Sequence, residues 1–572
     1  MIPITRKEKY INEIVGGGNT APETPQTREE IFFADILGEV VAPSPITRAE
    51  KYLAKIANKY SGELPEPVTR IERFLARAAG MNVSIPTPVT REEIYWDTFI
   101  KTQRVVYGWH IDPTISNSFN AVTYLEDAVG MAPAAMGEST FDYGSWKNAF
   151  FMPKPCMLKS DGTVDYYLDP NDYTKKADGT LSDVANPDYD GNTMMEWGKI
   201  WYKFVRTEID GEGYFYVSNY RVDNTYHCWC NIDSENNETD HFYTAIYNGT
   251  GTTKLRSISG VALTSANGNG NTNVTQEVTR ATANNTTSAV EWYTEVFSDK
   301  LLINALLVLL GKSLNTQTTF GRGLDTGGQT EKEAYITGTL NDKGLFWGVT
   351  ANGNSAVKVF GMENWWGCVW RRAAGCISVD NALKVKLTYG TADGSTVNGY
   401  NQTGNGYIDN GNIPTSNDYI KTMRYNELGY SPSSVTGGSS TTYYGDYFYQ
   451  NTGTRYLMLG GAFGLGVGAG AFCFSLSGAP GQTLWYVATA LSCKPLARKN
   501  PETNLNQSLR TFTVYFYNGS TLLQTAENVQ YGGTATYTGE TPAKDGFTFS
   551  GWQPSNVNIT ADTSCYAQFT EG

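Results

Sequence analysis

The sequence is poor in the residues on which most enzymes and metalloproteins depend. Its 572 residues include only three histidines and eight cysteines, and charged residues make up 18%. Eight cysteines in a chain of this length do not form a disulfide scaffold. The net charge of −13, without a basic stripe, argues against binding to nucleic acid. We therefore expect reduced thiols and no nucleic-acid partner.

Long apolar segments are also missing. The longest, "LLINALLVLL" at residues 301–310, is too short to span a bilayer and predicts a buried helix. The first residues, "MIPITRKEKYINEI", lack the apolar region of a signal peptide. We expect synthesis in a cytoplasm and no membrane insertion. The 59 glycines and 37 tyrosines instead predict a mainly β, turn-rich (α+β) protein of two to four domains with large contact surfaces.

One short phrase occurs five times within the first 105 residues. Each copy has proline, then threonine two positions later, then glutamate three further on, which is the pattern of a helix capping box. The threonines are Thr5, Thr27, Thr47, Thr69 and Thr90, and the glutamates are Glu8, Glu30, Glu50, Glu72 and Glu93. Gly16, Gly38, Asn58 and Gly80 are expected to end the first four helices, whereas Lys101 at that position predicts a longer fifth helix.

Apolar residues recur at helical spacing in each phrase and form one stripe. The predicted stripe includes Tyr10, Phe32, Tyr52, Phe74, Tyr95 and Trp96. Because a three-turn helix is marginal alone in water, the stripe must be buried. We expect burial against symmetry mates or another protein, so that residues 1–105 form an arm for attachment and oligomerisation. A stacked solenoid and a small helical bundle are the alternatives.

These phrases resemble the "TRxExYLxxIAG" repeats of bacteriophage fibre-like structural proteins. The segments "NAVTYLEDAVGMAPAAMG", "MMEWGKIWYKF", "QTTFGRGL" and "VKVFGMENWWGCVW" are similar to phage tail or fibre proteins, and together such segments cover most of residues 106–400. The resemblance implies a virion protein, assembled in the host cytoplasm. It also implies a homo-oligomer, usually a trimer for such fibres, with an arm that contacts other virion proteins.

A second resemblance concerns residues 106–498. "GCVW" at Gly367–Trp370 and "RYLMLGGAF" at Arg455–Phe463 are similar to two core strands of the C-type-lectin-like fold, which phage tropism determinants share with formylglycine-generating enzymes. The closing "GFR" strand of that fold is replaced by "LSCKP". Residues 388–454 are expected to form one long loop, rich in the residue types of adaptable binding loops.

The last residues differ in character from the rest. "GFTFSGW" at Gly546–Trp552 resembles the internalin B-type (Listeria–Bacteroides) repeat, a small β-grasp-like module. The expected domains are therefore an arm (1–105), a C-type-lectin-like adhesin domain (106–498), a linker (499–510) and a β-grasp-like module (511–572).

Candidate metal and phosphate sites are weak. His227, Cys228, Cys230 and His241 could hold zinc, but alternation along a strand would place the two cysteines on one face and His227 on the other. "DPNDYTKKADGT" has Thr174 where a calcium-binding EF-hand loop needs glycine. "GVGAGAF" at 466–472 lacks the Lys-Ser/Thr of a phosphate loop and predicts a closely packed strand. We predict no metal and no cofactor.

Candidate catalytic groups are equally sparse. Cys473 and Cys493 lie twenty residues apart and lack the cysteine-pair motif of formylglycine-generating enzymes. Glycan hydrolysis needs two carboxylates facing each other across a groove, and Asp446 and Glu427 could be nominated only among many. We predict no enzyme activity.

Aromatic side chains give the candidate binding site. "TTYYGDYFYQN" carries five aromatics in seven residues, more than one strand face can bury. A strand would place Tyr443, Tyr447 and Tyr449 on one side and Tyr444 and Phe448 on the other. We expect an exposed side to bind a glycan or a protein surface. Trp366 and Trp370 are expected in the core, and Trp365 is a further ligand candidate.

The functional prediction is a phage fibre protein that binds a host or environmental surface, either a glycan or a protein. Three alternatives stay open. They are a head fibre or capsid decoration protein, a virion-associated glycan depolymerase, and a bacterial surface adhesin.

Overall fold

The computed structural model describes residues 3–571 except 4, 15–23, 38, 58, 61, 63, 80, 82, 84, 104, 224, 234–236, 288–289, 388–406, 496–510, 520, 531–532, 554, 558 and 560–562, and without side chains at 101–103, 511–512, 528 and 530. Contacts divide the chain into two compact units, residues 1–496 and 497–572. The predicted linker lies outside the described residues. The protein has several β-sheets and short N-terminal helices, so the mainly β prediction is confirmed at this level.

Each repeated phrase forms one helix. The five are α1 (Arg6–Ile14), α2 (Arg28–Ile36), α3 (Arg48–Ile56), α4 (Arg70–Ala78) and α5 (Arg91–Gln103). The capping boxes are confirmed: Thr47 accepts a hydrogen bond from the Glu50 amide, while the Glu50 carboxylate accepts one from the Thr47 amide. The fifth helix continues past Lys101, as predicted. The residues expected to end the first four helices lie outside the described part of the chain.

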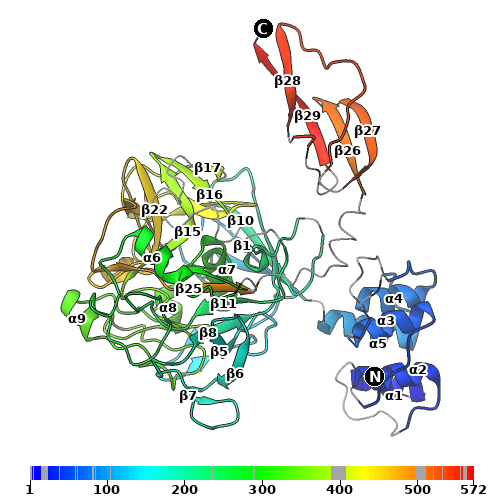
Figure 1. The fold of residues 1–572 in the computed structure, drawn as a ribbon, viewed down its shortest axis with the longest axis horizontal. Helices are drawn as coiled ribbons and strands as arrows, with labels where there is room; N and C mark the ends of the chain where they lie inside the picture. Colours follow the sequence, from blue (N-terminus) through cyan, green and yellow to red (C-terminus); the bar gives the residue numbers. More distant parts are fainter. Residues whose placement is uncertain are drawn as a thin grey trace. The chain divides into compact units, whose positions relative to one another are not determined.

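The five helices close into a ring, with α1 in contact with both α2 and α5 (Figure 1). Their apolar stripes pack against one another and form a single core. The stripe residues are almost fully buried within one chain, including Tyr10, Phe32, Tyr52, Phe74, Tyr95 and Trp96. The expectation that other copies or another protein bury the stripe is therefore wrong, because the helices bury it against one another within one chain. The role of the arm in oligomerisation stays a prediction.

One ion pair is repeated around this five-helix ring. The arginine after each capping threonine binds the capping-box glutamate of the next helix. The pairs are Arg6–Glu30, Arg28–Glu50, Arg48–Glu72, Arg70–Glu93 and, closing the ring, Arg91–Glu8, with shortest N–O distances of 2.6–3.2 Å. Each glutamate thus caps its own helix and receives the arginine of its neighbour. Hydrogen bonds from Arg70 and from backbone amides lower the pKa of Glu93 to about 2.

The central body is built around a buried helix, α7 (Phe297–Gly311), all of whose residues are buried. This confirms the prediction for the "LLINALLVLL" segment. A four-stranded sheet packs against it, where the Trp109 indole donates a hydrogen bond to the Ala305 carbonyl. The sheet order is β2 (Val122–Glu126), β1 (Val106–Ile111), β10 (Gly213–Ser218) and β9 (Trp201–Val205).

Two larger sheets complete the body (Figure 1). One has the order β12 (Val290–Thr294), β25 (Leu491–Pro495), β11 (Phe242–Ala245), β8 (Gly191–Trp197), β5 (Lys154–Lys159), β6 (Val164–Asp169) and β7 (Asp172–Lys176). The other, here called the core sheet, has the order β17 (Ile408–Asn412), β16 (Ala382–Val385), β15 (Trp370–Val379), β22 (Thr454–Gly460), β23 (Gly470–Gly478), β21 (Tyr447–Gln450) and β18 (Asp418–Tyr419), and β24 (Val487–Ala488) pairs with β15.

The body also contains smaller elements. They are the strand pairs β3 (Ala135–Met136) with β4 (Phe141–Asp142), β13 (Lys358–Val359) with β14 (Met362–Glu363), and β19 (Thr422–Asn426) with β20 (Gly429–Ser434), and the helices α6 (Val274–Thr282), α8 (Thr316–Phe320) and α9 (Gln329–Ala334). No helix among the described residues is long and apolar enough to cross a membrane.

The two segments similar to C-type-lectin strands lie side by side in the core sheet, since β15 pairs antiparallel with β22. The "LSCKP" segment forms β25, which belongs to the seven-stranded sheet instead. The single long loop predicted for residues 388–454 is wrong for its described part, 407–454, because that part contains β17 to β21 and the first residue of β22.

The second unit contains one four-stranded sheet in the order β27 (Thr521–Gln530), β26 (Thr511–Asn518), β29 (Thr563–Glu571) and β28 (Phe547–Gln553). Val514, Phe516 and Cys565 form its core, and the Trp552 ring packs on Phe516 at 4.6 Å between centroids. The "GFTFSGW" motif supplies β28. Apolar residues at alternate positions of β26, Val514 and Phe516, thus bury one face of this sheet.

Candidate functional site

The aromatic run before β22 divides as the alternation predicted, but only part of it is accessible. Tyr444 and Phe448 are buried, and the Tyr444 and Tyr425 hydroxyls share a hydrogen bond. Tyr443, Tyr447 and Tyr449 are half-buried. Tyr444 and Phe448 are therefore core residues, which corrects their assignment as ligand candidates.

Trp365 is also a core residue, contrary to its nomination as a ligand candidate. Only 3% of it is exposed, and its indole N–H donates to Asn304 Oδ1 at 2.8 Å. The Lys300 Nζ lies 3.4 Å from its ring centroid, where burial lowers the pKa of that lysine to about 7. Trp366 is fully buried, as predicted.

A pocket of about 370 Å³ opens where the core sheet meets two loops. Its lining comes from four strands and two loops. The strands contribute Trp370 (β15), Tyr449 (β21), Met458 (β22), and Ser475 and Ser477 (β23). The loop after β22 contributes Ala462, Phe463, Gly464 and Leu465, and the loop before β24 contributes Gln482, Leu484, Trp485 and Tyr486. Its size is at the lower end for small-molecule sites, which span about 300–1,000 Å³. We call it the aromatic pocket.

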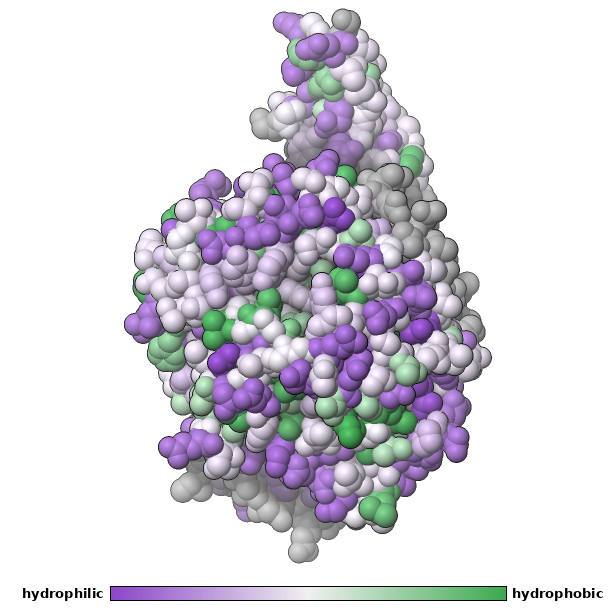
Figure 2. Space-filling view, turned by 90° about the vertical axis from the view of Figure 1, so that its left-hand side faces the viewer, coloured by the Kyte–Doolittle hydropathy of each residue, from purple (hydrophilic) through white to green (hydrophobic). Residues whose placement is uncertain are grey.

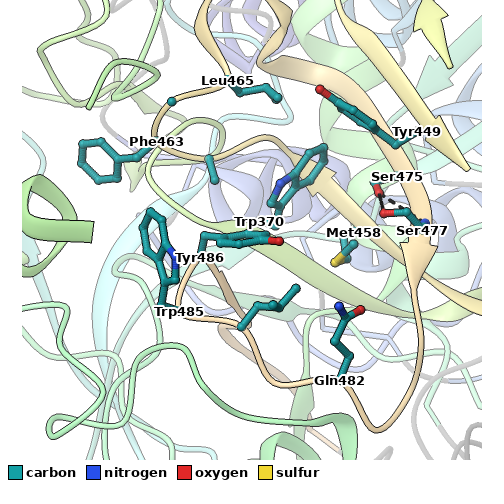
Figure 3. A pocket seen from close by; sticks show the side chains of 13 residues that line it. Trp370, Tyr449, Met458, Phe463, Leu465, Ser475, Ser477, Gln482, Trp485 and Tyr486 are labelled. Carbon is teal, nitrogen blue, oxygen red and sulfur yellow. Dashed lines mark hydrogen bonds between the residues drawn. The ribbon is translucent and has the colours of Figure 1, made fainter. Parts of the chain in front are cut away.

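The aromatic rings of the pocket hold one another in place. Figure 3 shows Trp370 and Tyr486 at its centre, with Tyr449 and Trp485 to either side. Trp370 and Tyr449 meet edge to face at 5.9 Å between centroids, and Trp485 and Tyr486 do the same at 5.2 Å. Tyr447 lies 4.7 Å from Tyr449 and extends the aromatic surface beyond the pocket. Edge-to-face pairs of this kind stabilise a fixed arrangement of rings.

Buried cations fix the loop that carries Trp485 and Tyr486. The Arg372 guanidinium donates to the Gln482 carbonyl at 2.7 Å, and the Lys332 ammonium donates to the Trp485 carbonyl at 2.6 Å. Both side chains are nearly inaccessible, and burial lowers the pKa of Lys332 to about 8. The loop is therefore set before any ligand arrives, which favours binding because less conformational entropy is lost.

The lining of the pocket is uncharged. All thirteen lining residues belong to the described chain, and none of them is acidic, basic, histidine or cysteine. Its polar groups are the Ser475 and Ser477 hydroxyls, which hydrogen bond to each other at 2.9 Å, the Gln482 amide and two tyrosine hydroxyls. Such a lining is suited to neutral, partly apolar molecules.

The two carboxylates nominated for glycan hydrolysis do not form a pair in this pocket. Asp446 is 1% exposed, and burial raises the pKa of its carboxyl well above the usual range. Its Oδ2 accepts a hydrogen bond from the Phe472 amide at 2.7 Å. Glu427 is exposed and lines other cavities, with His227.

The segment of the candidate zinc ligands is not a strand, contrary to the prediction. Trp229–Asn231 form a short 3₁₀ helix, in which Cys228 and Cys230 are buried while His241 is exposed. Across the described residues, no group of three or more His, Cys, Asp or Glu is placed to hold a metal ion.

The two remaining loop motifs have structural roles. Thr174 lies in β7, where its amide and its hydroxyl both donate to Asp172 Oδ1, the hydroxyl at 2.6 Å. The glycine-rich segment is a strand only from Gly470, because Gly466–Gly468 form a 3₁₀ turn. Gly470 confirms the expected close packing, since a side chain there would collide with Asp446.

Sequence reasoning missed most of the pocket. Of the predicted ligand residues only Tyr449 lines it, and Trp485 and Tyr486 were not singled out. Trp370 is buried in the core, as predicted, and also lines the pocket. The one local signal was the adjacent pair of aromatics in "GAPGQTLWYV", shortly after the glycine- and proline-rich residues 478–481. No protein-family model matches the chain, and a comparison with curated proteins finds no match.

Proposed function

We propose that this protein is a phage fibre protein that attaches to a host or environmental surface, and that the aromatic pocket is its attachment site. The main support for the proposal is the uncharged pocket lined by aromatic side chains, one loop of which is fixed by hydrogen bonds from Arg372 and Lys332. Tyrosine and tryptophan provide large contact areas at low entropic cost, as in other binding surfaces.

One face of the molecule supports attachment through a defined site. Figure 2 shows one face of the molecule, on which hydrophobic residues form small patches separated by hydrophilic ones. Broad apolar patches mark large protein–protein interfaces, and this face has none of that kind. A pocket that admits one end of a ligand fits such a surface better than a flat interface.

The antiparallel pairing of β15 with β22 supports a C-type-lectin-like arrangement for the central body, because these strands carry the two matching motifs. In that arrangement the pocket is lined by Trp370, the first residue of β15, and by the loop that follows β22. Similarly, the four-stranded sheet of the second unit supports a β-grasp-like module at the C-terminus.

The attachment site is tested with the full-length protein and a matched variant. Purified wild-type protein is incubated with bacterial envelopes, and the retained fraction is compared with that of Trp485→Ala. We expect the variant to be retained several-fold less while its circular dichroism spectrum is unchanged. Equal retention of both proteins would place the attachment site elsewhere. Release of reducing sugar by the wild type would instead favour a depolymerase.

The virion assignment needs a separate test. Immunogold labelling of phage particles with an antibody against the central body should decorate them, and the position of the label separates a tail fibre from a head fibre. Labelling confined to bacterial cells would favour a bacterial surface adhesin.

A further inference from the structure

We infer that the aromatic pocket binds one or two neutral pyranose rings of a glycan, without calcium. The inference rests on the proposed attachment function and names the ligand class of that same site. It combines three features of the lining, namely its aromatic walls, its neutral polar groups and its lack of charge.

The aromatic walls match the shape of a sugar ring. A pyranose presents C–H groups on its faces and hydroxyls around its edge, so it stacks on an aromatic ring while its edge stays available for hydrogen bonds. Trp485 and Tyr486 are half-buried, so their rings are partly open to a ligand. The Trp370 ring is only 6% exposed and forms the pocket floor. A cavity of about 370 Å³ accommodates one or two such rings rather than an extended chain.

The polar groups match the hydroxyls of a sugar. The Ser477 hydroxyl and the Gln482 side-chain amide can each donate and accept hydrogen bonds, as sugar hydroxyls do. Ser475 is buried and hydrogen bonds to Ser477. Ser477 is half-buried, so its hydroxyl is the more accessible of the two. Sites that hydrogen bond a ligand hydroxyl discriminate strongly against analogues that lack it.

The absence of charge excludes the acidic sugars. A sialic or uronic acid would bring a carboxylate into a lining that has no cation to pair with it, and burying an unpaired charge is costly. The net charge of −13 on the chain also repels anionic glycans. Calcium needs carboxylate and carbonyl oxygens, and the described lining contains no carboxylate.

The test uses full-length protein and simple sugars. The methyl glycosides of glucose, galactose, mannose and N-acetylglucosamine are compared with N-acetylneuraminic acid and glucuronic acid by saturation-transfer NMR and calorimetry, with and without EDTA. We expect at least one neutral glycoside to bind with a dissociation constant of roughly millimolar, a weak value typical of a small ligand with few contacts. EDTA should leave that affinity unchanged.

Two pocket variants and one control locate the site. Tyr486→Ala removes a stacking ring, and Gln482→Ala removes an amide without changing the loop backbone; each should weaken neutral-sugar binding at least five-fold. Tyr566→Ala, an exposed tyrosine in the second unit, should bind like the wild type.

Several results would overturn the inference. They are preferential binding of the acidic sugars, loss of binding in EDTA, and binding that none of the pocket variants weakens. If no sugar binds but envelope retention still depends on Trp485, the sugar inference fails while the attachment site stands. If sugars bind at the pocket but retention is independent of it, the proposed attachment function fails instead.

Discussion

Replacing Arg70 by glutamine should open the five-helix ring locally. Arg70 donates two hydrogen bonds to the Glu93 carboxylate, at 3.0 and 3.3 Å, and one to the Thr87 carbonyl at 2.9 Å. Glu93 is 3% exposed, so the variant would leave a buried carboxylate without its cation. Removing one partner of a fully buried ion pair costs about 3–5 kcal/mol.

The expected loss is smaller than that, because half of the Arg70 side chain is exposed and water screens the pair. Backbone amides of Val89 and Thr90 also continue to bind Glu93. We therefore expect a loss of about 2 kcal/mol, which corresponds to an approximately thirty-fold increase in local opening.

Hydrogen–deuterium exchange of the full-length protein measures this opening directly, in peptides from α4 and α5. The matched control is Arg73→Gln on the same helix, since Arg73 is exposed and no ion pair of its side chain is recorded among the described residues. Faster exchange in Arg70→Gln but not in Arg73→Gln supports the ring. Equal exchange in the wild type and in both variants would refute the reasoning.

Three further predictions concern acid, assembly and the core. The ring should loosen as the pH falls from about 4.5 towards 2. Arginine and amide hydrogen bonds lower the pKa values of Glu30, Glu50, Glu72 and Glu93 against the opposing effect of burial, so their stabilisation is present above the unfolded pKa and is lost on protonation. Urea unfolding of the ring, followed at about pH 6, 4 and 2.5, would show this loss. Deleting residues 1–105 should leave the number of subunits unchanged in light scattering, because the stripe is buried within one chain. A lower number would show that these residues hold subunits together. Trp365→Phe should destabilise the central body by about 2 kcal/mol in urea unfolding, because Asn304 Oδ1 loses a buried donor, without changing sugar binding at the pocket.

Local features of the ring were predictable from the sequence, whereas its closure was not. The threonine and glutamate of each capping box act within four residues, so spacing alone identifies them. The arginine between them acts on the next helix, about 23 residues away, and on the first helix in the case of Arg91. Nothing in a single phrase shows which glutamate an arginine will reach.

The aromatic site shows the same limit. Alternation correctly separated Phe448 from Tyr447 and Tyr449, because side-chain direction is a local property of a strand and these residues lie in β21. Tyr443 and Tyr444 also differ in burial, but they lie in a turn before that strand. Which side is covered depends on distant segments: Tyr444 is buried by Tyr425 and Phe472, and Tyr449 opens onto a loop that ends at Tyr486. Those contacts come from residues that no local pattern links.

The closing contact between α1 and α5 changes the reach of the N-terminal region. Five helices in a row would form a rod that carries its first residue far from the central body. In the ring the chain returns to its starting point, and Arg91 of the last helix binds Glu8 of the first. The first helix therefore lies against the last one, and their first turns are joined. The distance between α1 and α5 therefore does not grow with the number of helices between them, and five helices give the chain no more reach than a contacting pair.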